Sequence, residues 1–337
     1  MIEIFVFFLI SISFSYFAKK INFLPNFSGE KHQAYLDEKR IPLIGGILLL
    51  IISSYLFYEN NFIFLVGSLF IYLIGLLSDA KILSSPKIRI ILQTIIVILI
   101  TYFLNLNITS TRIDFLDKIF EIKFLSFIFS VFCLIVLLNG SNFIDGLNGL
   151  LLGYLIIVIL ILAKLDLLNY FEFENKTLLI LIFSLLILLI LNYLNFFYLG
   201  DGGSYLSGII LGYILISIYN YNIYISPYFI ILLLWYPCFE NLFSIIRKSN
   251  LNRSPVVADN KHLHQLFFYF IKVKFKFSNL ISNNLTSILI NCYNFLIMLI
   301  STNNISSTKF QILLIFINLI VYLFIYKILF NFKFKKK

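Results

Sequence analysis

The sequence predicts an all-α polytopic membrane protein with about eleven transmembrane helices. Of the 337 residues, 61% are hydrophobic and only 12% are charged, about half the charged share of a typical soluble domain. The mean hydropathy is +0.97. The apolar residues also form continuous runs of about 20 residues, which is the length of helix that crosses a bilayer core. This composition excludes a soluble enzyme, a disordered protein and a secreted domain built on disulfides.

A window of about 20 apolar residues finds eleven candidate helices in chain order. They cover residues 3–18, 42–58, 62–77, 88–104, 119–138, 147–164, 177–195, 204–219, 223–242, 279–300 and 308–331. The first run has no basic region ahead of it, so we expect a membrane helix there and not a cleaved signal peptide. The tenth run is the weakest because asparagines dilute it. We expect one domain over residues 1–337, and the longest loop is near 243–278.

Positively charged residues indicate the orientation, because membrane proteins retain Lys and Arg on the cytoplasmic side. Of the 26 Lys and Arg, 20 fall in the loops after odd-numbered helices and in the C-terminal segment, and 6 fall on the other side. This asymmetry predicts an N-terminus outside and a C-terminus in the cytoplasm. It also accounts for the net charge of +10, so no nucleic-acid partner is expected.

Polar clusters gather in five loops on the predicted cytoplasmic side. These loops read EKHQAYLDEKRIPLIGG, LLSDAKILSSPKIR, NGSNFIDGLNGL, FYLGDGGSY and RKSNLNRSPVVADNKHLHQLF. The loops on the other side hold short stretches such as YENN and YNYN. Because the Gly, Asp and His clusters share one face, the sequence predicts a polar site at the cytoplasmic end of the helix bundle.

The second cluster carries a carboxylate and two cations. Asp79 ends the third apolar run, where it is either a solvated boundary residue or a site residue that faces the bundle. Lys87 and Arg89 follow it. They either anchor a helix at the cytoplasmic surface or form a basic rim for phosphates.

The third cluster combines polar side chains with glycines. Asn142 is able to cap a helix, and Asp145 and Asn148 are three residues apart, so they share a face if the segment is helical. The cluster is either an ordinary turn or a ligand site. Three ligand-bonding side chains between glycines at a membrane interface favour a site.

The last two clusters add a carboxylate and two histidines. Asp201 lies in a Gly-Asp-Gly-Gly sequence that opens the eighth helix, where free N–H groups favour a phosphate and a carboxylate suits Mg²⁺. His262 and His264 have only one other histidine in the chain, His32, which disfavours a zinc site. The pair either binds phosphate with neighbouring basic residues or is a solvated interfacial pair.

Together the clusters offer carboxylates for a metal and cations for phosphates at one membrane face. That combination predicts phosphoryl transfer, in which positioning and charge stabilisation supply most of the catalysis. A lipid-phosphate acceptor would explain why such an enzyme is embedded in a membrane.

The five clusters, in this order, resemble the polyprenyl-phosphate N-acetylhexosamine-1-phosphate transferases, the MraY/WecA-like family of glycosyltransferase family 4. KRIPLIGG resembles the first cytoplasmic loop of that family, and GLLSDAKILSSPKIR resembles the segment that usually carries Asp-Asp. SNFIDGLNGL, FYLGDGGSYLSG and ADNKHLHQLF, the last with RSP ahead of it, are similar to three further motifs. The resemblance covers about residues 30–268, and the helices over about 279–331 lie beyond it.

The resemblance implies transfer of an N-acetylhexosamine 1-phosphate from a UDP-amino sugar to undecaprenyl phosphate. UMP is released, and Mg²⁺, for which Mn²⁺ can substitute, is required. The implied catalytic residues are Asp79 and Asp201, and Asp201 is also the metal ligand. The implied substrate-binding residues are Asn142, Asp145 and Asn148 around the nucleotide, His262 and His264 near the diphosphate and sugar, and Lys87 and Arg89 near the acceptor phosphate.

Three positions depart from the family pattern. Ser78 stands where the first Asp of the usual pair is found, Asn148 replaces an Asp of many members, and NYLNFFYL ahead of Gly200 lacks a basic residue. A mechanism that needs the first carboxylate of the pair therefore cannot apply. The His-x-His sequence without a third histidine favours the simple-sugar branch over the peptidoglycan-precursor branch.

These features predict a multi-pass protein of the bacterial inner membrane with a cytoplasmic active site. It would initiate a lipid-linked surface polysaccharide such as a lipopolysaccharide O-antigen, or a cell-wall polymer. Two alternatives stay open: a phospho-MurNAc-pentapeptide transferase, and a catalytically impaired homologue that binds or transports lipid, which Ser78 favours. The sequence leaves open the sugar, the pathway and the oligomeric state, a homodimer included.

Overall fold

The computed structural model describes residues 2–26, 41–59, 61–171, 175–250 and 260–334, and within these ranges the regular structure is helical. The α-helices are α1 (Ile2–Lys20), α2 (Gly45–Phe57), α3 (Phe62–Asp79), α4 (Pro86–Phe103), α5 (Asp114–Phe120), α6 (Lys123–Ile144), α7 (Leu150–Lys164), α8 (Asn175–Tyr193), α9 (Gly200–Tyr221), α10 (Pro227–Leu233), α11 (Trp235–Ser249), α12 (Leu263–Phe275), α13 (Asn279–Ser301) and α14 (Thr308–Phe334). Two short 3₁₀ helices cover Leu167–Phe171 and Thr302–Asn304.

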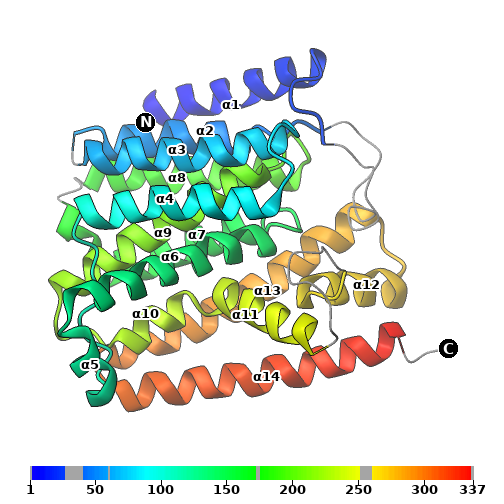
Figure 1. The fold of residues 1–337 in the computed structure, drawn as a ribbon. Helices are drawn as coiled ribbons and strands as arrows, with labels where there is room; N and C mark the ends of the chain where they lie inside the picture. Colours follow the sequence, from blue (N-terminus) through cyan, green and yellow to red (C-terminus); the bar gives the residue numbers. More distant parts are fainter. Residues whose placement is uncertain (1, 27–40, 60, 172–174, 251–259, 335–337) are drawn as a thin grey trace.

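The long helices lie side by side and reverse direction from one to the next (Figure 1). Among the described residues, eight helices are long and apolar enough to cross a membrane, or nine if α10 and α11 form one span with a 78° bend. The helices α2 and α7 are apolar but shorter. Each of the eleven expected runs overlaps one of these helices, or the bent pair α10 and α11. The prediction of an all-α multi-pass membrane protein is therefore confirmed, whereas the count of eleven crossings stays a prediction.

Two helices lie where the sequence predicted loops. The helix α5 precedes α6, and α12 occupies part of the expected loop 243–278. The prediction of one long loop there was wrong because LHQLFFYFIKVKF is too short and too charged for a membrane-length window. Its apolar side is nevertheless buried, with Leu266 and Phe268 almost fully covered, so α12 is held by tertiary packing.

The helix α9 forms the centre of the bundle. Every residue from Gly202 to Ile218 is buried, as expected for a helix that is apolar on all sides. Its N-terminal turn packs so closely on α3 that a Cβ added to Gly75 would lie 2.4 Å from the Gly202 backbone. Small residues permit this approach between membrane helices, and it brings the end of α3 against the start of α9.

The reversing helix directions place the polar segments at one end of the bundle. The end of α3, the start of α4, the end of α6, the start of α9 and the end of α11 all lie at this end, together with the end of α14 (right in Figure 1). The sequence had predicted this common face. Residues 30–40 of the first cluster and the RSP sequence of the fifth lie outside the described residues.

At the opposite end of the bundle, one arginine forms hydrogen bonds to several connections between helices. The guanidinium of Arg112 donates hydrogen bonds to the carbonyls of Ile223, Tyr224, Ile225 and Ser306 and to the hydroxyl of Thr308, at 2.7–3.1 Å. These acceptors belong to two loops, one between α9 and α10 and one between α13 and α14. We call this group the Arg112 clasp, and it ties three connections of the bundle together.

Candidate active site

Asp79 holds the N-terminus of α9. Its Oδ1 accepts a hydrogen bond from the N–H of Asp201 at 2.9 Å, and its Oδ2 accepts one from the N–H of Gly202 at 3.1 Å. The carboxylate thus satisfies two donors that a helix start leaves open and faces the positive end of the helix dipole. Two of the N–H groups that were expected to be free for a phosphate are therefore already bound to Asp79.

The turn before Asp201 has the shape that this contact requires. Gly200 adopts a φ of +76°, a conformation that favours glycine. A Cβ at this position would lie 2.6 Å from Oδ2 of Asp79. From the other side, the N–H groups of Gly45 and Gly46 donate to the carbonyls of Tyr198 and Leu199 at 3.0 and 3.1 Å. The first and fourth clusters are therefore joined at this turn.

The carboxylate of Asp201 is the centre of a polar network from three helices. Its Oδ2 accepts hydrogen bonds from the Ser78 hydroxyl and the Arg89 guanidinium, both at 2.6 Å. Its Oδ1 accepts one from the amide of Asn142 at 2.8 Å. The two side chains of the ion pair remain partly exposed, at 20% for Arg89 and 29% for Asp201. A charged centre that solvent still reaches is open to a ligand.

Ser78 has a defined place in this network. It donates to Asp201 and accepts a hydrogen bond from Arg89 at 2.5 Å, so it bridges the two charged groups. A neutral hydroxyl fits between an acid and a base, whereas a carboxylate here would add a second negative charge beside Asp201. The departure from the family pattern at Ser78 is thus accommodated by the hydrogen bonds around it.

The end of α6 brings a third carboxylate to the centre. Asn142 lies in the last turn of α6 and donates to both Asp201 and the Ser204 hydroxyl. Asp145 follows directly as the C-terminal cap residue. Burial raises the pKa of the Asp145 carboxyl well above its usual range, and the negative charges of Asp201 and Asp79 raise it further. Carboxylates that raise one another's pKa in this way are stabilised by an added cation.

The structure does not bring Asn148 or Lys87 into this centre. The segment after Ile144 is a turn that ends at Gly149 with a φ of +69°, so the expected shared face of Asp145 and Asn148 does not exist. Asn148 is buried, its amide donates to Asn195, and its N–H donates to Asn283. Lys87 is exposed on α4, two residues before Arg89.

The two histidines lie at the start of α12, beside the turn after α6. The His264 ring is fully buried, and its Nε2 would lie 2.7 Å from a Cβ at Gly146. The His262 ring stacks on it with centroids 5.6 Å apart. Burial, together with the neighbouring His262, lowers the pKa of His264 to about 3. The His264 imidazole is therefore neutral at physiological pH. Neither of its nitrogens has a hydrogen-bond partner in the described part of the chain.

The sequence reasoning missed Glu240 of α11. This carboxylate is fully buried and accepts hydrogen bonds from Tyr322 and from the N–H of Leu263, and its Oε1 lies 2.9 Å from Nδ1 of His262. It is the single charged residue of the expected ninth run. An ionisable residue inside a membrane span indicates a functional site, so this signal was present in the sequence.

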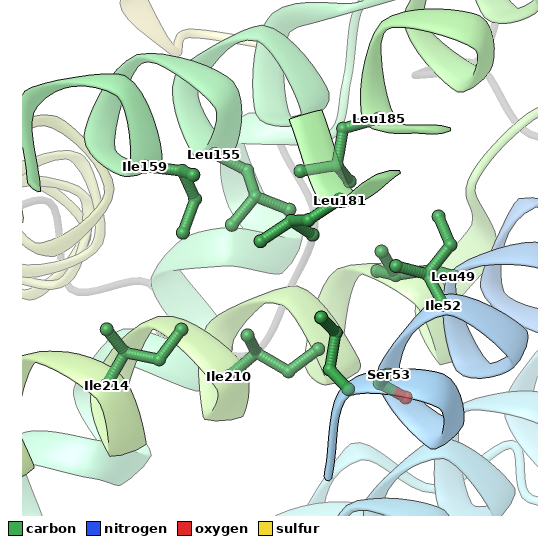
Figure 2. Close-up of a pocket in the computed structure, with 10 residues that line it drawn as sticks. Leu49, Ile52, Ser53, Leu155, Ile159, Leu181, Leu185, Ile210 and Ile214 are labelled. Atoms are coloured by element: carbon green, nitrogen blue, oxygen red, sulfur yellow. The ribbon is translucent and has the colours of Figure 1, made fainter. Parts of the chain in front are cut away.

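An apolar cavity lies elsewhere in the bundle, between α2, α7, α8 and α9 (Figure 2). Its lining is made of Leu and Ile side chains together with Ser53, and the Ser53 hydroxyl donates to the Leu50 carbonyl. This lining offers no charged group to a phosphate. The polar centre around Asp201 is therefore the candidate active site.

Comparison with known proteins identifies a family and several relatives to which the chain is similar. A family model described as glycosyl transferase family 4 matches residues 61–219, a range that holds Asp79, Arg89, Asn142, Asp145 and Asp201. The chain is 27% identical, over 70% of its length and 68% of the relative, to a probable undecaprenyl-phosphate N-acetylglucosaminyl 1-phosphate transferase of Bacillus subtilis (strain 168).

Two further relatives carry the name undecaprenyl-phosphate alpha-N-acetylglucosaminyl 1-phosphate transferase. The protein of Thermotoga maritima is 26% identical over 77% of this chain and 78% of the relative. The protein of Escherichia coli O157:H7 is 25% identical over 77% of this chain and 74% of the relative. These matches extend well beyond the residues of the family model.

Proposed function

We propose that the chain is a polyprenyl-phosphate N-acetylhexosamine-1-phosphate transferase of glycosyl transferase family 4, the family whose model matches residues 61–219 and whose named relatives are 25–27% identical to it. It transfers the N-acetylhexosamine 1-phosphate group of a UDP-amino sugar to undecaprenyl phosphate. The products are a lipid-pyrophosphate sugar and UMP. The names of the three relatives support the lipid acceptor and favour N-acetylglucosamine as the sugar.

The observation that carries the proposal is the network around Asp201. Ser78 and Arg89 hold one oxygen of its carboxylate and Asn142 holds the other, while Asp79 fixes the helix turn on which it stands. The helices α3, α4 and α6 thus position the Asp201 carboxylate at one end of the helix bundle. Such preorganised charge is what phosphoryl transfer requires from a protein.

In the proposed step, an oxygen of the lipid phosphate attacks the β-phosphorus of the donor. A new phosphorus–oxygen bond forms, and the bond between the β-phosphorus and the oxygen bridging to the α-phosphorus breaks, so UMP leaves with that oxygen. A phosphate monoester loses its second proton near pH 6. The acceptor is therefore already anionic at neutral pH, and the reaction does not require the carboxylate that Ser78 replaces.

We also propose Mg²⁺ as the cofactor, with Mn²⁺ as a substitute. The oxygen donors that fit it are the carboxylates of Asp201 and Asp145, whose mutual repulsion a cation relieves. Among the described residues no group of three His, Cys, Asp or Glu side chains could hold a metal by itself. Mg²⁺ takes one or two carboxylates together with substrate phosphates, and when bound it neutralises charge on the diphosphate. Arg89 adds a guanidinium that suits phosphate oxygens.

The proposed location is the bacterial inner membrane, with the site at the cytoplasmic face. The support is that the polar centre lies at the end of the bundle where α14 ends (Figure 1), and that 20 of the 26 Lys and Arg fall, in the sequence, in the loops after odd-numbered apolar runs and in the C-terminal segment. UDP-sugars are water-soluble and anionic, which suits a basic face. The lipid product would initiate a surface polysaccharide, O-antigen or cell-wall polymer.

The test is UMP release by the purified protein in nanodiscs with undecaprenyl phosphate. A panel of UDP-N-acetylhexosamines is assayed with Mg²⁺, with Mn²⁺ and with a chelator. We expect UMP from at least one donor, and only when both the metal and undecaprenyl phosphate are present. Absence of UMP from every donor would refute the proposal and favour the impaired homologue that binds or transports lipid. Release from UDP-MurNAc-pentapeptide alone would favour the peptidoglycan-precursor branch.

A further inference from the structure

Glu240 is an acidic side chain enclosed within a membrane-spanning region. It lies on α11, after the bend that separates α10 from α11, and its exposed fraction is 0%. Removing a carboxylate from water is unfavourable unless hydrogen bonds or an opposite charge compensate it. The contacts of Glu240 therefore indicate why the residue is there.

The carboxylate connects two helices that the phosphate network does not use. Oε1 faces Nδ1 of His262 at 2.9 Å and accepts from the N–H of Leu263 at 3.3 Å. Oε2 accepts from the Tyr322 hydroxyl of α14 at 2.8 Å. The start of α12 and the middle of the C-terminal helix are therefore both bound to one carboxylate.

His262 in turn borders the candidate active site. Its ring packs against Phe143 of α6 with centroids 5.4 Å apart, and against His264 at 5.6 Å. Phe143 lies between Asn142 and the carboxyl-bearing turn at Asp145. The His262 ring therefore contacts α6 one residue away from Asn142, whose amide donates to Asp201.

We propose that Glu240 is a positioning residue that holds the His262 imidazole in its working orientation, and that Tyr322 fixes Glu240 from the C-terminal helix. The proposal rests on the proposed function, because the working orientation is the one in which His262 meets the donor. A carboxylate bonded to one ring nitrogen sets the tautomer and direction of a histidine. The helix α14, which lies beyond the stretch that resembles the family, thereby contributes to the site through Tyr322.

The first test reads the histidine without any substrate. The chain has three histidines, His32, His262 and His264, so selective ¹⁵N labelling of histidine gives three imidazole signals, which single His→Asn variants assign. We expect Glu240→Gln to shift the His262 nitrogens strongly and Tyr322→Phe to shift them in part. A matched control is Asn241→Leu, which removes a buried hydrogen bond to the Val136 carbonyl from the adjacent position of α11 and should leave them in place.

The second test is a double-mutant cycle on UMP release. We expect Glu240→Gln to lower kcat/KM for the donor about 10- to 100-fold, the range found when carboxylates that orient histidines are removed. In a His262→Asn background the same change should cost less than about 2-fold, because its effect acts through His262. Asn241→Leu should have the same effect in both backgrounds.

Two results would overturn the inference. One is an unchanged His262 signal in both Glu240→Gln and Tyr322→Phe, and the other is a full additional loss from Glu240→Gln on top of His262→Asn. If Glu240→Gln does not fold, the milder Tyr322→Phe decides both readouts. If the wild-type protein releases no UMP, the proposed function fails, while the ¹⁵N signals still decide whether Glu240 positions His262.

Discussion

The two ends of the bundle both use an arginine, but in opposite ways. In the Arg112 clasp, the guanidinium donates to five oxygen atoms of two loops. At the other end, Nη1 of Arg89 donates to Asp201 and Ser78, while its buried Nε has no hydrogen-bond partner among the described residues. The buried nitrogens of His264, at the same end as Arg89, are equally without a partner in that part of the chain.

The two arginines therefore differ in the kind of partner they have: Arg112 bonds mainly to backbone carbonyls, whereas Arg89 bonds to the side chains of Asp201 and Ser78. Folded proteins satisfy nearly all their buried donors and acceptors, and each exception needs an explanation. The Arg112 guanidinium bonds mainly to backbone carbonyls, four of its five acceptors, as expected of a group that holds loops in place. The Asp201 end combines three carboxylates with buried nitrogens of Arg89 and His264 that have no partner among the described residues, which is the arrangement expected where an anionic substrate and a cation complete the site.

The largest expected effect follows from removing charge at the Asp201 end. Asp201→Asn keeps the shape of the side chain but removes the carboxylate that carries the network, and we expect UMP release to fall about 1,000-fold. The amide keeps one acceptor oxygen for Ser78 and Arg89 and places its NH₂ group toward Asn142; because the site is partly exposed to solvent, we expect the melting temperature to fall by only a few degrees. Wild-type rates in the purified variant would contradict the role of Asp201.

A second prediction concerns the turn that positions Asp201. Gly200→Ala places a methyl group 2.6 Å from Asp79 at a φ of +76°, so either the Asp79 contact or the turn must shift. A displacement of about 1 Å in an active site can cost about 100-fold in rate, and we expect a loss of 10- to 100-fold. Gly212→Ala on the same helix, away from the polar end, tests whether crowding of α9 by itself lowers activity; an equal loss there would refute the positioning argument.

Loss of the Arg112 clasp should lower the stability of the protein and leave its activity nearly unchanged. Arg112→Ala removes five hydrogen bonds that join loops at the other end. We expect the melting temperature in nanodiscs to fall by several degrees, while kcat/KM per folded molecule stays within about 2-fold of wild type. A selective loss of activity without a loss of stability would show that the two ends are not separable in this way.

The smallest expected effect is a pH dependence of stability from His264. Its pKa is about 3 in the folded protein and about 6.5 in the unfolded chain. Between these values the unfolded chain binds a proton that the folded protein does not, so stability falls as the pH falls below about 6.5, by up to about 1.4 kcal/mol per pH unit. Melting temperatures measured from pH 7.5 to 5.5 should drop less in His264→Gln than in wild type; equal slopes would contradict the burial of a neutral imidazole.

Much of the fold and part of the site could be predicted from the sequence. Long apolar runs specify membrane helices by length alone, and the alternation of helix directions then places Asp79, Asp145 and Asp201 at one end. Which way a side chain points within a turn could not be predicted. Gly149 reverses the chain after Asp145, so Asn148 turns toward Asn195 and Asn283 and away from Asp201.

Hydrogen bonds between elements that lie far apart in the chain could not be predicted from the sequence either. The asparagines of α13 weakened its membrane prediction, yet Asn283 and Asn291 hydrogen-bond the backbone of the turn at Asn148 and Gly149. Glu240 was visible as a lone acid in an apolar run, but its partners His262 and Tyr322 lie 22 and 82 residues later in the chain. Only packing in three dimensions brings them together.

In the proposed reaction, the group transferred at the Asp201 end is a sugar phosphate and not a sugar alone. The most direct measurement uses a UDP-N-acetylhexosamine labelled with ³²P at the β-phosphate, together with undecaprenyl phosphate, Mg²⁺ and the purified protein. We expect the label to pass into the lipid extract in amounts equal to the unlabelled UMP, and Asp201→Asn to abolish both. Label that remains in water-soluble UDP while the lipid gains sugar, or label that never leaves the donor, would contradict the proposed reaction.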